Sequence, residues 1–217
     1  MKYKKIISLL VGSIIVLSVF ASVVGIFADQ GSGTYEIESF RGEIIKIHGK
    51  GLYSYDSVSV AAQGIAQDIV TVILGIPLLI ISLCLGLKGS LKGRLLLTGT
   101  LGYFLYTYMS YVFLWMYNPM FIVYVILMST SFFCLVLLIM SYDIKSMSLS
   151  FNEKLPVKFI GGFQIFFSIA LCLLWIKKII PTITNETIPV GLEHYTTLVV
   201  QGLDLGFIVP ISFLQVY

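Results

Sequence analysis

Charged residues are scarce in this 217-residue chain, because Asp, Glu, Lys and Arg together make up only 12% of it. Hydrophobic residues make up 58%, which is more apolar surface than one soluble core of this size can bury. The formal net charge of +3 is too small to indicate a nucleic-acid partner. Composition therefore predicts a multi-pass membrane protein whose main partner is the lipid bilayer.

Cysteine and histidine are also rare. Cys84, Cys134 and Cys172 all lie inside apolar runs, and their odd number argues against a disulfide framework. They are typical of small buried apolar side chains. His48 and His194 lie outside the apolar runs, and no Cys or His spacing resembles a metal site. We expect neither a metal nor a cofactor.

Long apolar runs, each able to cross about 30 Å of hydrocarbon, follow one another along the chain. They predict an all-α membrane protein of about six transmembrane helices, with a short N-terminus at residues 1–5 and a five-helix bundle within residues 65–217. As an alternative, the first run is a signal peptide cleaved near Ala28, which leaves five spans. Pro77 interrupts the second run and is expected to free the carbonyl of Ile73. The predicted spans are residues 6–28, 65–87, 95–117, 120–140, 157–180 and 196–217.

Residues 29–64 form the one long polar segment of the sequence. Charged residues alternate there with β-branched and aromatic ones, which predicts a small extracytoplasmic β-like segment of two or three strands. Gly49-Lys50-Gly51 is the predicted turn. A loose polar loop is the alternative.

The placement of Lys and Arg predicts the orientation. If the N-terminus is cytoplasmic, nine of these residues lie inside and five outside, and the bias is strongest in the short loops. We therefore expect a cytoplasmic N-terminus in a bacterial plasma membrane. The nine are Lys2, Lys4, Lys5, Lys88, Lys92, Arg94, Lys145, Lys154 and Lys158; the five are Arg41, Lys46, Lys50, Lys177 and Lys178.

The run YDSVSVAAQGIAQDIVTVILGIPLLIISL, followed by KGSLKGRLLLTGTLGYFLYTYMSY and MYNP, resembles a family of prokaryotic multi-pass membrane proteins to which no reaction is assigned. The resemblance covers roughly residues 40–140, with a weaker echo at Gln201-Gly202-Leu203-Asp204-Leu205-Gly206. It implies a helical membrane fold and no particular activity. Members of this family continue beyond a segment like the last predicted span, so the resemblance also implies a longer protein.

Two aspartates lie within apolar runs, where insertion of Asp costs about 2.5 to 3.5 kcal/mol at a helix centre. Asp68 is expected one turn below the outer end of its helix, where the interface can hydrate it. Asp204 is expected roughly 13 Å deep in the last span. A carboxyl group at that depth needs a hydrogen-bond partner, a water-filled cavity or a proton.

Polar side chains share one side of three predicted spans. Because consecutive spans run in opposite directions, these side chains fall in the outer half of the membrane and predict one polar pocket open to the outside. We expect Tyr106, Gln201 and Asp68 within hydrogen-bonding distance of Asp204. The candidate ligand- or proton-binding residues are Gln67, Asp68, Thr71, Tyr103, Tyr106, Ser110, Gln201 and Asp204.

Alternative roles stay open for these polar residues. They can join helices through hydrogen bonds worth about 0.6 kcal/mol each, without any ligand. Tyr111, Trp115 and Tyr117 are typical of an outer aromatic belt. Gly202 and Gly206 form a small-residue pair that suits close helix packing.

Two classes of function fit these features. The first is a transporter or sensor that binds a small solute, a cation or a proton in the outer-leaflet pocket. The second is an accessory subunit that packs against a membrane-protein partner or a second copy and has no ligand site. An enzyme is disfavoured, because Gly202-Leu203-Asp204 lacks the spacing of the Gly-x-Gly-Asp motif of intramembrane aspartyl proteases and no His-Glu-x-x-His motif occurs.

Overall fold

A computed structural model describes residues 2–143, 150–151, 155–185, 188–189 and 191–214. The chain divides into two compact units, which we describe separately. The first unit contains Met1–Glu38 and Ile44–Leu149, and the second contains Ser39–Glu43 and Ser150–Tyr217.

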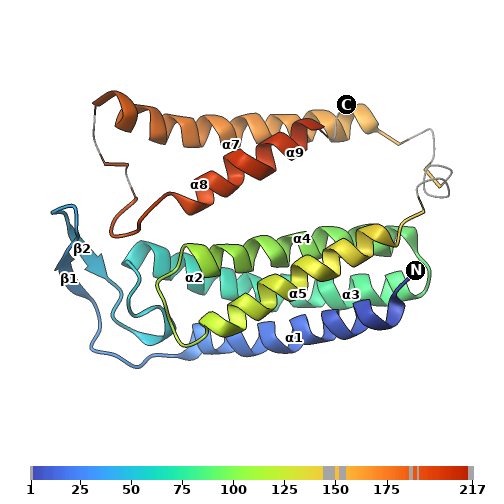
Figure 1. The fold of residues 1–217 in the computed structure, drawn as a ribbon, viewed down its shortest axis with the longest axis horizontal. Helices are drawn as coiled ribbons and strands as arrows, with labels where there is room; N and C mark the ends of the chain where they lie inside the picture. The colour runs from blue at the N-terminus through green and yellow to red at the C-terminus, as the bar shows by residue number, and fades with distance from the viewer. Residues whose placement is uncertain (1, 144–149, 152–154, 186–187, 190, 215–217) are drawn as a thin grey trace. The chain divides into compact units, whose positions relative to one another are not determined.

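The first unit is a bundle of helices that run side by side (Figure 1). Ser57 caps one of these helices by accepting from the N–H of Val60, and Ser90 caps another by accepting from the N–H of Gly93. The buried stripe of α4, which includes Leu97, Leu101 and Phe104, forms the centre of the core. The helices are α1 (Lys4–Phe27), α2 (Val58–Val70), a π-helical turn η2 (Thr71–Gly75), α3 (Ile76–Leu87), α4 (Leu91–Phe113) and α5 (Phe121–Met140).

Helix α1 shows why the sequence forms a bundle. Its buried residues recur every three or four positions, which places them on one stripe of an α-helix. Small residues at the C-terminal end of this stripe, including Ser22 and Gly25, allow the neighbouring helices to approach closely. The opposite face exposes large apolar side chains such as Leu9 and Phe27, as expected for a helix that faces lipid.

The polar segment forms a small antiparallel sheet of β1 (Tyr35–Glu38) and β2 (Ile44–Ile47). The strands reverse at residues 39–43, a turn that the sequence analysis does not locate. The predicted turn at Gly49-Lys50-Gly51 leads into the 3-10 helix η1 (Gly51–Tyr53). Instead of a third strand, this segment has an isolated β-bridge between Ile47 and Ser57.

Four helical stretches among the described residues are long and apolar enough to cross a membrane, as in helical membrane proteins. Helix α4 is not one of them, because Tyr, Thr and Gly lower its hydropathy. The final stretch, Val199–Leu214, is shorter. The six-span count therefore remains a prediction. The four candidates are Lys4–Phe27, Val58–Leu87, Phe121–Met140 and Val157–Thr184.

The second unit pairs the long helix α7 (Val157–Asn185) with α8 (Val199–Leu203), a π-helical turn η3 (Asp204–Ile208) and α9 (Val209–Leu214). Arg41, in the turn between β1 and β2, also belongs to this unit. Its guanidinium donates to the backbone carbonyls of Glu193 and Tyr195, both at 2.9 Å. These two bonds tie the Arg41 side chain to the connection that precedes α8.

The two π-helical turns have the same construction. Thr71 begins η2 and Asp204 begins η3, and both side chains are buried. In η2 the N–H of Ile76 donates to the carbonyl of Thr71, five residues earlier. In η3 the N–H of Val209 donates in the same way to the carbonyl of Asp204. Each donor stands immediately before a proline. Pro77 and Pro210 cannot donate a helical hydrogen bond, and the wider turn accommodates each of them. The sequence predicts an interruption at Pro77, and the structure shows that it takes the form of a π-turn.

Candidate functional site

Asp68 lies inside the first unit. Helix α2 begins at Val58 rather than at the predicted Ile65, so Asp68 follows about three turns of helix instead of one. Its exposed fraction is 3%. Neighbouring side chains of the bundle therefore bury Asp68, and its depth relative to the membrane interface stays a prediction.

Two tyrosine hydroxyl groups face the carboxylate of Asp68. The hydroxyl of Tyr53 lies 2.5 Å from Oδ2, and the hydroxyl of Tyr111 lies 3.1 Å from Oδ1. The two hydroxyls are 3.3 Å apart, and that of Tyr111 is also 3.0 Å from the carbonyl oxygen of Gly64. We call Asp68, Tyr53 and Tyr111 the aspartate–tyrosine cluster. Among the described residues, no cation forms an ion pair with Asp68.

Tyr53 is placed in this cluster by η1, outside the membrane helices. Its exposed fraction is 1%, and the isolated bridge between Ile47 and Ser57 closes the segment that carries it. Burial raises the pKa of the Tyr53 phenol well above its ordinary value. Tyr53 therefore remains a hydrogen-bond donor toward Asp68 at physiological pH.

Helix α1 and an aromatic stack complete the walls of the cluster. Gly25 of α1 lies against Oδ2 of Asp68 so closely that a Cβ atom there would overlap the carboxylate. The ring of Tyr111 stacks on those of Trp115 and Tyr124, with centroids 4.6 and 4.8 Å apart. The indole Nε1 of Trp115 is buried and has no hydrogen-bond partner among the residues that the structure describes. The carboxylate is thus enclosed by packed side chains and backbone.

A second polar cluster, of Gln67, Thr71, Tyr103 and Thr107, lies beside the first. The amide Nε2 of Gln67 donates to the Tyr103 hydroxyl at 2.7 Å and to the Thr107 hydroxyl at 3.1 Å. The hydroxyls of Thr71 and Tyr103 are 2.9 Å apart. The polar sides predicted for the second and third spans therefore meet, and each of these groups is hydrogen-bonded within the protein.

Ser110 and Tyr106 are hydrogen-bonded to each other within α4, and this bond involves neither of the two polar clusters. The Ser110 hydroxyl donates to the backbone carbonyl of Tyr106 at 3.0 Å, within its own helix. This is the usual local bond of a serine in an apolar helix. A role of these two residues in ligand binding stays a prediction.

Asp204 lies in the second unit with an exposed fraction of 7%. The indole Nε1 of Trp175, on α7, donates to its Oδ2 at 2.8 Å. Trp175 is a partner that the sequence analysis does not name. Gln201 is half-buried one turn before Asp204. Asp68 and Tyr106 belong to the first unit, and their predicted approach to Asp204 stays a prediction.

The predicted packing pair Gly202 and Gly206 is open in the part of the chain that the structure describes. Apart from the backbone of its own helix and its chain neighbours, no described atom lies within 4 Å of the position that a Cβ would take at either glycine. Close packing of this face against another helix therefore stays a prediction. No group of three or more His, Cys, Asp or Glu side chains suited to a metal ion occurs among the described residues.

Tyr53 and Tyr111 are, besides Trp175, the site residues that sequence reasoning missed. The sequence analysis places Tyr111 in an aromatic belt, but its exposed fraction is 2% and it bonds to Asp68. A signal was present, because Tyr103, Thr107 and Tyr111 follow one another every four residues on one face of α4. No comparable signal points to Tyr53, which comes from the segment before α2. No family model, curated protein or solved structure matches this chain.

Proposed function

We propose that this chain is a multi-pass membrane protein that binds a proton at Asp68 and senses or couples to that proton. The observation that carries the proposal is a buried carboxylate with a phenol facing each of its two oxygens and no cation beside it among the described residues. Intramembrane ionisable residues commonly mark proton or ion pathways. The close contacts of Gly25, Tyr53 and Tyr111 favour a proton over a solute or a metal ion, because a proton needs no additional space.

The aspartate–tyrosine cluster has a complete set of hydrogen bonds in both protonation states of Asp68. When Asp68 is ionised, Tyr53 donates to Oδ2 and Tyr111 donates to Oδ1. When Asp68 is protonated at Oδ1, it donates to the Tyr111 oxygen, and Tyr111 donates to the carbonyl of Gly64. One phenolic hydrogen thus changes its acceptor when the proton binds.

Two neighbours can transmit this change. Tyr53 belongs to η1, so the strength of its bond to Asp68 affects the segment that follows the β1–β2 hairpin. Tyr111 stacks on Trp115, which lies just after the end of α4. Protonation of Asp68 is therefore expected to alter both the outer segment and the environment of Trp115.

Fluorescence of Trp115 provides the test. The chain has two tryptophans, so a Trp175→Phe background leaves Trp115 as the reporter. We expect a sigmoidal change of its emission with pH, which Asp68→Asn abolishes because an amide reproduces only the protonated arrangement. Asp29→Asn is the matched control, since Asp29 is exposed. A pH-independent emission, or a transition that survives in Asp68→Asn, would reject the proposal.

The finer topology belongs to the same proposal: six membrane spans, a cytoplasmic N-terminus and location in a bacterial plasma membrane. It is supported by the excess of Lys and Arg in the segments at one end of the predicted spans. Reporter fusions after Gly89 should be active as cytoplasmic fusions, and fusions after Lys50 as extracytoplasmic ones. The reverse result would invert the orientation and place the aspartate–tyrosine cluster in the inner half of the membrane.

A second candidate function, an accessory subunit, is supported by the open faces of Gly202 and Gly206. Such a pair lets another helix approach closely. Pull-down in mild detergent distinguishes the two candidates, because an accessory subunit brings down a stoichiometric membrane partner or a second copy. Gly202→Leu should then abolish capture while Gly12→Leu, at another open glycine, should not.

A further inference from the structure

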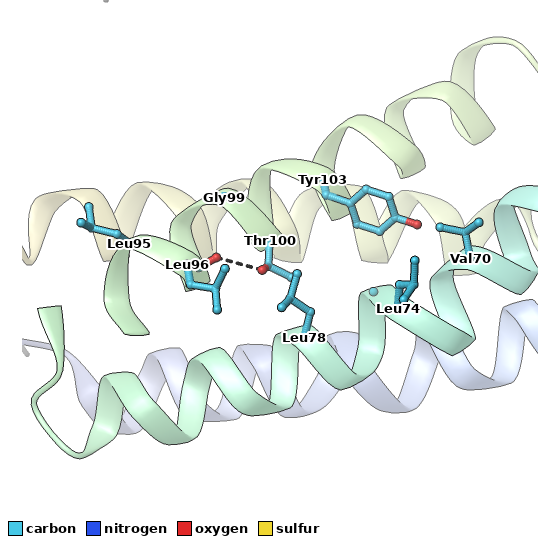
Figure 2. A pocket seen from close by; sticks show the side chains of 9 residues that line it. Val70, Leu74, Leu78, Leu95, Leu96, Gly99, Thr100 and Tyr103 are labelled. Carbon is cyan, nitrogen blue, oxygen red and sulfur yellow. Dashed lines mark hydrogen bonds between the residues drawn. The ribbon is translucent and has the colours of Figure 1, made fainter. Parts of the chain in front are cut away.

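An apolar groove of about 390 Å³ runs along the first unit between the α2–α3 helix and α4. Figure 2 shows Val70, Leu74 and Leu78 on one wall. The opposite wall is formed by Leu95 and Leu96 on α4. The leucine side chains are at least partly exposed, so the groove opens on the outer surface of the bundle.

Glycines explain why the groove exists. Near the turn between α3 and α4 the helices touch, because a Cβ at Gly93 would overlap Leu85 and lie 2.7 Å from the backbone nitrogen of Gly86. Farther along, Gly99 has no neighbour within 4 Å of its Cβ position. The helices are therefore in contact at the turn, and the missing side chain at Gly99 leaves the groove open.

The floor of the groove is apolar although it contains Thr100 and Tyr103. The Thr100 hydroxyl donates to the carbonyl of Leu96 at 2.8 Å, which leaves its methyl group for the groove (Figure 2). The Tyr103 hydroxyl is bonded to Gln67 and Thr71. The groove thus offers no free hydrogen-bonding group for a polar solute, and a hydrocarbon chain suits it.

The end of the groove nearest the α3–α4 turn is basic. Lys92 lies on the same face of α4 as Leu96, Gly99 and Tyr103, one turn before the groove begins. Lys88 caps the C-terminal end of α3, four residues before Lys92 in the chain, and both lysines are exposed. We propose that the groove holds an acyl chain of an anionic phospholipid whose phosphate lies between Lys88 and Lys92. Clusters of basic residues at the membrane surface attract anionic headgroups in this way.

The lysines test the headgroup part of the proposal. Native mass spectrometry of the full chain with phosphatidylglycerol or phosphatidylcholine of identical chains should show tighter binding of the anionic lipid. Each lysine near the surface contributes about fivefold, so the double variant Lys88→Gln/Lys92→Gln should lose about thirtyfold of that preference. Lys4→Gln/Lys5→Gln, which changes two exposed lysines before the first predicted span, should retain it.

A groove-filling variant tests the acyl-chain part. Gly99→Leu has space for its side chain and should reduce retention of both lipids, whereas Gly12→Leu on α1 should not. Equal binding of the two lipids by the wild type would overturn the proposal. So would unchanged lipid retention in Gly99→Leu, which would show that the retained lipid is not held in the groove. The lysine variants alter only exposed side chains, so they remain informative if Gly99→Leu fails to fold.

Discussion

Gly25 of α1 and Asp68 of α2 are in direct contact, and the absence of a side chain at Gly25 makes room for the carboxylate Oδ2. This contact joins the first helix to the polar centre of the bundle. It also explains why a residue within an otherwise apolar helix must be small at this position. Helix α1, for which the sequence predicts no functional residue, thus forms one wall of the site.

Replacing Gly25 by Ala should destabilise the protein by about 1–3 kcal/mol, because the new methyl group overlaps the Asp68 carboxylate. Thermal unfolding in detergent measures the effect. Gly12→Ala, where nothing lies within 4 Å of the new Cβ, is the control and should be nearly neutral. In the background Asp68→Ala, the penalty of Gly25→Ala should largely vanish. An unchanged penalty there would show that the overlap with Asp68 is not its cause.

Tyr53→Phe should make the stability less sensitive to alkaline pH. Burial holds the pKa of Tyr53 above its ordinary value, so the folded protein keeps a proton that the unfolded chain releases above about pH 10. The stability of the wild type therefore falls as the pH rises beyond that point. The variant lacks this contribution, although it is less stable at neutral pH because it loses the bond to Asp68.

Melting temperatures from about pH 8 to about pH 11 provide the measurement. The difference between the wild type and Tyr53→Phe should shrink over this range. Tyr55→Phe, at an exposed position, should follow the wild-type curve. A constant difference across the range would show that Tyr53 does not keep its proton.

Much of the fold follows from hydrophobic periodicity in the sequence. The long apolar runs predict the helices, and the alternating polar segment predicts a small sheet, which the structure contains. Helix starts are less accurate, because Ser57 caps α2 ahead of its apolar run. The burial of Asp68 comes from Tyr53, Tyr111 and Gly25, which pack around its carboxylate.

The candidate site could be predicted only in part. The meeting of Gln67 and Thr71 with Tyr103 follows from the helical faces of two consecutive antiparallel helices. The bond between Tyr53 and Asp68 depends on the path of a 3-10 helix, for which the sequence carries no periodic signal. The partner of Asp204 was missed because an indole donor on an apolar helix resembles any other buried aromatic residue.

Arg41→Gln should loosen the connection before α8. The substitution removes charge-assisted bonds to the carbonyls of Glu193 and Tyr195. Hydrogen–deuterium exchange of residues 191–195 should become faster, on the order of tenfold, because bonds to charged groups contribute about 1.5 kcal/mol or more. Lys46→Gln on β2 is the control, since Lys46 is exposed. Exchange that responds equally to both variants would mean that Arg41 does not hold this segment.

Trp175→Phe should loosen the π-turn that begins at Asp204. The substitution keeps an aromatic ring but removes the hydrogen bond from the indole to the carboxylate, and hydrogen bonds to charged groups contribute about 1.5–3 kcal/mol. Hydrogen exchange of residues 199–214 should accelerate on the order of tenfold. Trp115→Phe is a matched control, because the buried Nε1 of Trp115 has no hydrogen-bond partner within the described part of the chain. In the background Asp204→Leu, Trp175→Phe should have little further effect on this exchange, and a full effect there would show that the indole acts through packing alone.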